Sequence, residues 1–253
     1  MNSIVSLTII ILLLCLFIWI NRYHTTCIRN IDELIMTPEE KKSLFSYLQI
    51  ISDLFNKNNI NYWIMSGTLL GSIRHNGMIP WDDDADIGVN ELDLEKILAL
   101  NNELNPLGYE IVPSWKIYKF KKIGVEYPFV DIFGFSKDNN KYILNHIILR
   151  NMWPNEYFTE DELFPLKIYK FENIYLKGPN YPIAYLDRMY HNWRFIGRHT
   201  GNHKSNRCVD ITLKLNEKNE QHKLKPYVYI KPSQDAKSEN DIHHNEKIIT
   251  IKK

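Results

Sequence analysis

The chain has few cysteines and almost no net charge, and each shortage excludes a class of protein. Of its three cysteines, Cys15 lies in an apolar run, so Cys27 and Cys208 can form at most one disulfide and make no metal-ligand spacing. With 31 basic and 30 acidic residues the formal net charge is +1, so we expect no nucleic-acid partner. No Asn begins an Asn-x-Ser/Thr sequence, and nothing indicates N-glycosylation. The 253 residues, 44% of them hydrophobic, suffice for one domain with appendages.

A long apolar run opens the chain at Ile4–Ile20, and Trp19 stands at its end, where aromatic residues of a membrane interface are common. No basic segment precedes the run and no small-x-small cleavage site follows it, so a membrane anchor is favoured over the alternative, a cleaved signal peptide. Arg22 and Arg29 come next, which favours a cytosolic catalytic domain but leaves the sidedness open. We therefore expect a single-pass membrane protein.

Three acidic residues, Asp82, Asp84 and Asp86, follow a turn at every second position. On an extended strand they project from one face, and Asp83 points to the other. Like charges on one face repel unless a cation lies between them, and a divalent ion is the usual partner of clustered oxygen ligands. An EF-hand loop does not fit, because the glycine comes one position late and the twelfth position is not Glu. The pattern predicts a metal site, and its alternative is a solvated acidic loop.

A single carboxylate, Asp131, stands in an otherwise apolar segment, Pro128–Phe135. A charge inside a core strand is costly unless a cation or several donors meet it. The simplest partner is the ion inferred at Asp84 and Asp86, and the alternative is a buried Lys or Arg. In the first case Asp131 either completes the coordination or takes a proton from an attacking hydroxyl, and the sequence leaves both roles open.

Alternating helical and strand patterns predict a mixed α/β domain. Helices are expected after the cap at Thr37, over Thr68–His75 and over Asn90–Leu104, and strands over Ile60–Met65, Tyr109–Val112, Trp115–Lys122 and Tyr127–Phe135. Beyond Gly201 the chain becomes polar. Short apolar patches there, at Val209–Leu215 and Tyr227–Ile230, indicate a small strand or two, Lys231–Glu246 is predicted to be disordered, and no chemistry is assigned to this part.

Four blocks of sequence occur in a specific order. They read SGTLLGSIRHNGMIPWDDDADIG from Ser66, VDIF from Val130, LFPLK from Leu163 and YLDRMY from Tyr185. Together they closely resemble the LicD family, which includes bacterial LicD and the animal fukutin and fukutin-related proteins, over about Ile31 to Gly201. The resemblance implies a nucleotidyltransferase-like fold, with a mixed sheet flanked by helices. The predicted organisation is a transmembrane anchor at 1–21, a stem at 22–30, the LicD-type domain at 31–201 and a partly disordered extension at 202–253.

The resemblance also implies an activity. It is that of a transferase which uses Mg²⁺ or Mn²⁺ to move a phospho-alcohol group, of the phosphocholine or alditol phosphate type, from a CDP-activated donor to a glycan or similar hydroxyl acceptor. His191 follows Tyr190 where family members often have Gly. The alternative function is therefore a non-catalytic glycan-binding or scaffold protein that keeps the fold.

The resemblance assigns roles by position. Asp84 and Asp86 match the metal-binding pair and Asp131 the third carboxylate, which makes these three the predicted catalytic residues. The predicted substrate-binding residues are Asp82, which precedes the pair, Ser66 and Gly67 in a phosphate-binding turn, Arg74 as a phosphate clamp and Lys119 before the third acid. For two of them a plainer reading is open: Arg74 as a surface charge and Lys119 as an exposed strand residue.

Overall fold

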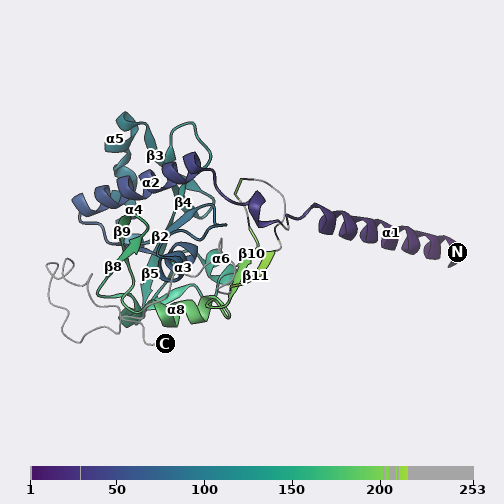
Figure 1. Cartoon of the computed structure of the whole chain (residues 1–253). Helices are drawn as coiled ribbons and strands as arrows, with labels where there is room; N and C mark the ends of the chain where they lie inside the picture. The colour runs from purple at the N-terminus through teal and green to yellow at the C-terminus, as the bar shows by residue number, and fades with distance from the viewer. Residues whose placement is uncertain (1, 29, 202, 205–208, 210, 216–253) are drawn as a thin grey trace.

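A computed structural model describes residues 2–28, 30–201, 203–204, 209 and 211–215, and it describes no side chains for residues 2–4 and 22–26. Its first element, α1 (Asn2–Thr26), extends away from the rest of the molecule (Figure 1), and its apolar side chains between Val5 and Ile20 are exposed. Among the described residues no helix is long and apolar enough to cross a membrane, so the predicted membrane anchor is not supported.

The predicted capped helix is confirmed as α2 (Pro38–Lys57). Thr37 Oγ1 accepts the Glu40 N–H at 3.2 Å, and the Glu40 carboxylate accepts the Thr37 N–H at 2.8 Å, which is a reciprocal capping box. The buried face of α2 carries Leu44, Leu48, Ile51 and Phe55, among others, and it packs against β4, β5 and β9. The spacing of the apolar residues at three and four therefore gives the helix its core-facing side.

Within the described residues seven strands form the main sheet, and their arrangement confirms the predicted mixed α/β class. They are β1 (Tyr62–Ile64), β2 (Ala85–Asn90), β3 (Tyr109–Ser114), β4 (Ile117–Lys122), β5 (Val130–Asp138), β6 (Lys141–Leu144) and β7 (Tyr157–Thr159). The order is β1-β2-β5-β4-β3, with β6 paired to β5 and β7 to β6. Only β2 and β5 run parallel among the paired strands of this sheet. The strand β5 is central, because its beginning pairs with β4 and its end with β6.

The segment predicted as one helix over Asn90–Leu104 is divided into short pieces. They are η2 (Glu91–Asp93), α4 (Leu94–Ala99), α5 (Asn101–Leu104) and η3 (Asn105–Leu107). The predicted cap is present, because Asn90 Oδ1 accepts the Leu92 N–H at 3.0 Å. The interruption between α4 and α5 lies at Leu100. It precedes Asn101, whose side chain accepts the N–H of Ile111 at 2.7 Å and donates to its carbonyl at 2.8 Å. A side chain that bonds a neighbouring strand in this way competes with a continuous helix.

The remaining elements are short helices and two pairs of strands outside the main sheet. They are η1 (Ile31–Glu33), α3 (Ser66–His75), α6 (Ile147–Met152), α7 (Glu160–Leu163), β8 (Lys167–Phe171), β9 (Ile174–Gly178), α8 (Pro182–Met189), β10 (Ile196–His199) and β11 (Ile211–Lys214). Strands β8 and β9 form a hairpin that contacts β1, and β10 and β11 form a second hairpin.

The hairpin of β10 and β11 shows that the packed chain continues past Gly201. Strand β11 confirms the small strand expected within Val209–Leu215, and Val209 forms a parallel bridge with Ile28. The patch at Tyr227–Ile230 and the disorder expected at Lys231–Glu246 lie outside the described residues. Cys15 is a free thiol, and Cys27 is disulfide-bonded.

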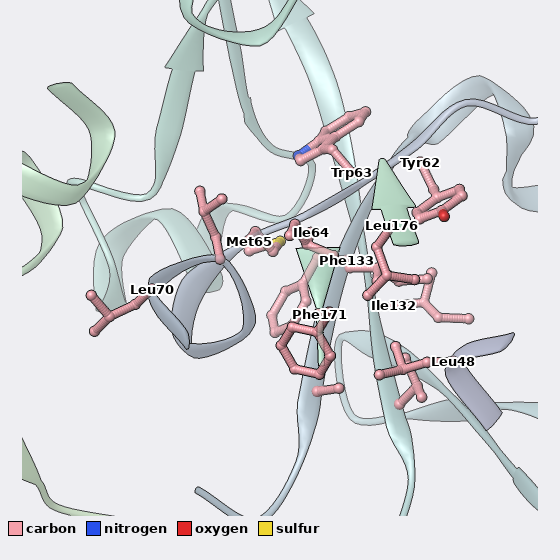
Figure 2. Close-up of a cluster of buried hydrophobic side chains, with 14 of the residues drawn as sticks. Leu48, Tyr62, Trp63, Ile64, Met65, Leu70, Ile132, Phe133, Phe171 and Leu176 are labelled. Atoms are coloured by element: carbon pink, nitrogen blue, oxygen red, sulfur yellow. The ribbon is translucent and has the colours of Figure 1, made fainter. Parts of the chain in front are cut away.

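The core lies between the sheet, α2 and the β8–β9 hairpin. Figure 2 shows part of it, with side chains from α2 (Leu48), β1 (Tyr62, Trp63, Ile64), β5 (Ile132, Phe133), β8 (Phe171) and β9 (Leu176). Trp63 is 1% exposed and its ring meets Phe135 and Phe158 edge-on or tilted at centroid distances of 5.3 and 6.3 Å. This packing ties β1 to β5, which carries Asp131, and to β7.

Candidate active site

The parallel pairing of β2 and β5 brings two of the predicted acids side by side. Asp86 is the register partner of Asp131, and on the other side of β5 Asp131 is paired with Lys119 of β4. Register partners on neighbouring strands project from the same face of a sheet. Asp84 precedes β2 and lies two residues before Asp86, so alternation directs it to that face too. The structure therefore confirms a common face for Asp84 and Asp86, whereas the predicted strand does not extend back to Asp82.

Asp84, Asp86 and Asp131 converge closely enough to share an ion. One carboxylate oxygen from each lies within 4.8 Å of the others. Asp131 is 5% exposed, and its Oδ1 has no hydrogen-bond partner among the described residues. Lys119 Nζ is 3.7 Å from that oxygen, which is an ion-pair distance but too long for a hydrogen bond. A buried carboxylate oxygen of this kind, grouped with two others, offers the all-oxygen ligands that a hard divalent cation takes.

The acids also raise one another's pKa. Burial, followed by the charges of Asp84 and Asp131, raises the pKa of Asp86 well above its usual range. Burial and Asp84 raise the pKa of Asp131 to about 7, although Lys119 acts in the opposite direction. One lysine at 3.7 Å therefore does not offset the cost of placing these carboxylates together. The three carboxylates therefore lack enough nearby positive charge to offset their mutual repulsion.

Asp82 faces the turn between β1 and α3. A Cβ atom added to Gly67 would lie 2.5 Å from Asp82 Oδ2, so any larger residue at this position would displace the carboxylate. Burial, followed by the charges of Asp84 and Asp83, raises the pKa of Asp82 well above its usual range. The structure thus places Asp82 between the predicted phosphate-binding turn and the three clustered acids.

Asp83 points away from the cluster, as predicted, and meets a residue that the sequence did not single out. Its Oδ2 accepts the backbone N–H of His203 at 2.7 Å, and its Oδ1 lies 2.9 Å from His203 Nδ1. Burial alone would raise the pKa of Asp83, but these hydrogen bonds lower it below its ordinary value. Asp83, Asp84 and His203 also lie within reach of one ion. Because His203 already occupies both oxygens of Asp83, we assign no metal to that group.

The predicted phosphate-binding turn begins α3 at Ser66. Ser66 has φ 44°, in the left-handed region that residues with a side chain rarely adopt. Its backbone N–H donates to Tyr185 Oη at 3.0 Å, and its hydroxyl donates to Glu156 at 3.3 Å. The donors of Ser66 are therefore engaged within the protein, and the next amides of the helix start, those of Gly67 and Thr68, are the better placed to meet an anion.

The two predicted basic residues, Arg74 and Lys119, are both more buried than charged side chains on a protein surface usually are. Arg74 is 3% exposed, and its guanidinium donates to the Trp193 carbonyl at 2.8 Å and to His75 at 2.9 Å. Burial lowers the pKa of Arg74 to about 10. The Lys119 ammonium lies 3.2 Å from the centre of the Phe129 ring. Arg74 lines the cavity described next, whereas Lys119 does not.

A cavity of about 740 Å³ joins these groups. Seven of the eight predicted site residues line it, namely Ser66, Gly67, Arg74, Asp82, Asp84, Asp86 and Asp131. A second set of lining residues comes from the chain after α7, namely Met189, Tyr190, His191, Trp193, Ile196, Arg198, His199, Thr200, Gly201, His203 and Thr212. The cavity has therefore an acidic wall, built on β2 and β5, and a C-terminal wall that carries basic side chains. We use these two names below.

Glu156 is the functional candidate that the sequence analysis missed. It is 5% exposed, lines the cavity, and has its pKa raised to about 7 by burial. It stands alone between α6 and β7 with no spacing to other acids, so no local pattern marks it. A buried carboxylate in a polar cavity can nevertheless be recognised once the fold is known.

The main sheet, the clustered acids and the start of α3 together define a class of domain. It is an α/β domain whose cavity offers carboxylates to a cation and backbone amides to an anion. Residues 59–181 match the family described as "LicD/FKTN/FKRP, nucleotidyltransferase domain". The chain thus contains a nucleotidyltransferase domain of the LicD family, as the sequence blocks predicted.

Known proteins that resemble the chain agree with this family. An uncharacterized protein of Rickettsia prowazekii is 38% identical over 175 residues, which is 68% of this chain and 63% of the relative. The match therefore spans less than two thirds of that protein's length. The lipopolysaccharide cholinephosphotransferase LicD of Haemophilus influenzae is 33% identical over 60 residues, 24% of this chain and 23% of the relative.

Among solved structures, a lincosamide antibiotic adenylyltransferase, LnuA, is similar over 62% of this chain and 87% of its own, with 19% identity and a TM-score of 0.39. A likeness at this level is too low to bear on the fold or the activity of the chain.

Proposed function

We propose that the chain is a metal-dependent transferase that moves a phospho-alcohol group from a CDP-activated donor to a hydroxyl group of a glycan or similar acceptor. The observation that carries the proposal is the convergence of Asp84, Asp86 and Asp131 at one edge of the cavity. The LicD-family domain and the name of the Haemophilus relative, a cholinephosphotransferase, support phosphocholine as the group transferred. An alditol phosphate stays an expectation from the resemblance of the sequence blocks.

The residues present fit a divalent cation. Their ligand atoms are all carboxylate oxygens, one of which, Asp131 Oδ1, is buried without a hydrogen bond, and the mutual rise of their pKa values means that a cation would relieve repulsion. In this proposal Asp84, Asp86 and Asp131 hold Mg²⁺ or Mn²⁺. When bound, the ion would supply positive charge that stabilises the negative charge developing on the donor phosphates.

Residues of the chain supply the rest of the chemistry. In the transfer, the bond between the two donor phosphates breaks, CMP leaves, a bond forms from the acceptor oxygen to phosphorus, and the hydroxyl proton is lost. Arg74 contributes a charge whose direction is fixed in advance by its bonds to Trp193 and His75. The amides of Gly67 and Thr68, at the start of α3, would bind a phosphate oxygen, because helix N-termini favour anions.

Calorimetry with CDP tests the proposal directly. The full chain should bind CDP in the presence of Mn²⁺ but not in EDTA. The double variant D84N/D86N should bind CDP under neither condition. CDP-choline and CDP-ribitol, offered with candidate glycans, then test turnover. Wild-type protein that binds no nucleotide with metal would contradict the proposal. Binding of a glycan without turnover of any activated donor would favour the alternative, a scaffold protein that keeps the fold.

Membrane attachment stays a prediction from the sequence. If Ile4–Ile20 anchors the chain, the full chain should resist carbonate extraction from membranes, whereas a chain starting near Ile31 should be recovered in the soluble fraction. Full release of the complete chain by carbonate would remove the anchor, and with it the predicted single-pass location.

A further inference from the structure

Glu156 is a buried carboxylate for which the proposed transfer has so far given no role. It lines the cavity from the segment between α6 and β7 and is 5% exposed. Among the described residues no Lys, Arg or His forms an ion pair with it; the nearby Arg188 pairs with Glu162 at 2.9 Å instead. A carboxylate kept in such a place without a cation needs other donors.

Two hydroxyl groups provide these donors. Tyr185 Oη donates a short hydrogen bond to Glu156 Oε1, and Ser66 Oγ donates to Glu156 Oε2 at 3.3 Å. Tyr185 Oη also accepts the backbone N–H of Ser66 at 3.0 Å. A tyrosine hydroxyl has one donor and two acceptor sites, so it can make both bonds at once. Glu156, Tyr185 and Ser66 therefore form a closed triangle of hydrogen bonds.

The triangle joins three elements that are far apart in the sequence. Tyr185 belongs to α8, is fully buried, and stacks on Phe158 of β7 with ring centroids 4.2 Å apart and planes 10° apart. Ser66 is the first residue of α3. The Tyr185 ring is thus held rigidly, and its hydroxyl fixes the position of the Ser66 backbone from the other side of the cavity wall.

The residue held in this way is the one with the unusual backbone. Ser66 has φ 44°, and such conformations persist where the surroundings hold them in place. The turn that follows is equally constrained, because Gly67 leaves no room for a Cβ beside Asp82. A small movement of Ser66 would therefore shift both the start of α3 and the position of Asp82.

We infer that Glu156 and Tyr185 are positioning residues: they hold Ser66 in its left-handed conformation, so that the amides of Gly67 and Thr68 face the phosphates of the donor. The inference rests on the proposed function for the identity of the ligand. The hydrogen-bonded triangle itself does not depend on it, and the two parts can be tested separately.

Amide hydrogen exchange at Ser66, measured by NMR without ligand, tests the triangle. The variants are E156A, E156Q and Y185F, and the control is E162Q, a half-buried carboxylate of the same region that pairs with Arg188 and does not line the cavity. Y185F and E156A should raise the Ser66 exchange rate at least tenfold. E156Q, whose amide can still bond Tyr185 and Ser66, should restore most of the protection lost in E156A, and E162Q should leave it unchanged. Unchanged exchange in Y185F would overturn the inference, even if E156A fails to fold.

Calorimetry with CDP and Mn²⁺ tests the consequence for binding. Y185F should weaken CDP binding about tenfold, and E156Q should restore most of the affinity lost in E156A. Wild-type protein that does not bind CDP would refute the proposed function, while the exchange experiment would still decide whether the triangle exists. If E156Q keeps both CDP affinity and Ser66 protection but loses turnover, Glu156 acts as a proton acceptor and the assignment as a positioning residue is wrong.

Discussion

The acidic wall and the C-terminal wall of the cavity are built in different ways. The acidic wall lies on β2 and β5, within the family-matched residues 59–181, and its acids are placed by strand register in a closely packed sheet. The C-terminal wall follows residue 181 and includes the β10–β11 hairpin. Trp81 packs closely on that hairpin, because a Cβ atom on Gly197 would lie 2.6 Å from the Trp81 ring. His203 adds the polar contact to Asp83.

This difference suggests a division of labour. Under the proposed function, the acidic wall offers carboxylates to the metal and a helix start to the donor phosphates. The C-terminal wall offers Arg198, His199 and Thr212, which lie outside the family match, and under the same proposal we expect substrate selection there. If the division holds, changes in the acidic wall should abolish turnover, and changes in the C-terminal wall should alter stability or affinity by less.

Asp131→Asn should have the largest effect. It keeps the shape of the side chain and removes one negative charge, so turnover should fall about 100-fold or more, because the predicted metal loses a ligand. Without metal the free energy of unfolding should change by no more than about 1 kcal/mol, because repulsion from Asp84 is relieved. Thermal melts in Mn²⁺ and in EDTA, with kinetic assays, measure both.

The matched control is Asp138→Asn, an exposed acid at the far end of the same strand. It should leave turnover and the metal-dependent rise in melting temperature unchanged. If Asp131→Asn instead lowers the free energy of unfolding in EDTA by roughly 3–5 kcal/mol, Asp131 forms a buried ion pair with Lys119. The predicted metal site would then be wrong.

Glu156→Gln should change how stability depends on pH. Burial raises the pKa of Glu156 from 4.5 to about 7, so the folded state binds this proton more tightly than the unfolded chain. The contribution of Glu156 to stability is therefore fully present below pH 4.5 and is lost as the pH rises through 7. Relative to E156Q, the wild type should lose up to about 3 kcal/mol between pH 4 and 8, because one pKa unit corresponds to about 1.4 kcal/mol.

Urea unfolding of both proteins at a series of pH values measures this difference. Asp84 and Asp131 contribute to the pH dependence of both proteins, so their contribution cancels in the comparison to first order. The charge of Glu156 is one of those that raise the pKa of Asp86, so the measured difference also includes this coupling. Parallel curves for the two proteins would show that Glu156 is ionised at neutral pH in the folded state.

His203→Ala should have a smaller effect, on the C-terminal wall. It removes the ring that meets Asp83 but keeps the backbone N–H, so a carboxylate that is 1% exposed loses one of two partners. We expect unfolding to become easier by about 1–3 kcal/mol. The control, Lys204→Ala, breaks a partly exposed ion pair with Glu40 and should cost at most about 1 kcal/mol. Equal losses in the two variants would contradict a specific role for His203.

Arg198→Ala should have the smallest effect. Its side chain is exposed and lines the cavity, so the free energy of unfolding should change by less than about 0.5 kcal/mol. Affinity for CDP should fall no more than about tenfold, and the loss should shrink at high salt, because an exposed charge is screened. If Arg198→Ala lost as much turnover as Asp131→Asn, the proposed difference in function between the two walls would be wrong.

Most of the acidic wall could be predicted from the sequence, because the patterns that mark its residues are local. The spacing of two in Asp82, Asp84 and Asp86 fixes a common direction, and a lone carboxylate among apolar residues marks Asp131. The cap at Thr37 and the turn before α3 were equally visible. The predicted helix over Asn90–Leu104 was interrupted by a bond from Asn101 to a neighbouring strand, which no pattern within the segment reveals.

The residues that escaped prediction have partners far along the chain. Glu156 is 90 residues from Ser66, and His203 is 120 residues from Asp83. Arg74 could be placed on a short helix, but its burial depends on the carbonyl of Trp193, 119 residues later. The boundary expected at residue 201 was set by a change in composition, whereas strand pairing between β10 and β11 extends the packed chain to Leu215.

The 120 residues between Asp83 and His203 also have a consequence for the synthesis of the protein. A ribosome adds about 5–20 residues per second, so Asp83 is made roughly 6–24 s before the histidine that neutralises it. During that interval the nascent chain carries four neighbouring aspartates, from Asp82 to Asp86, without their C-terminal cover. The cavity can close only after residue 212 has left the ribosomal tunnel.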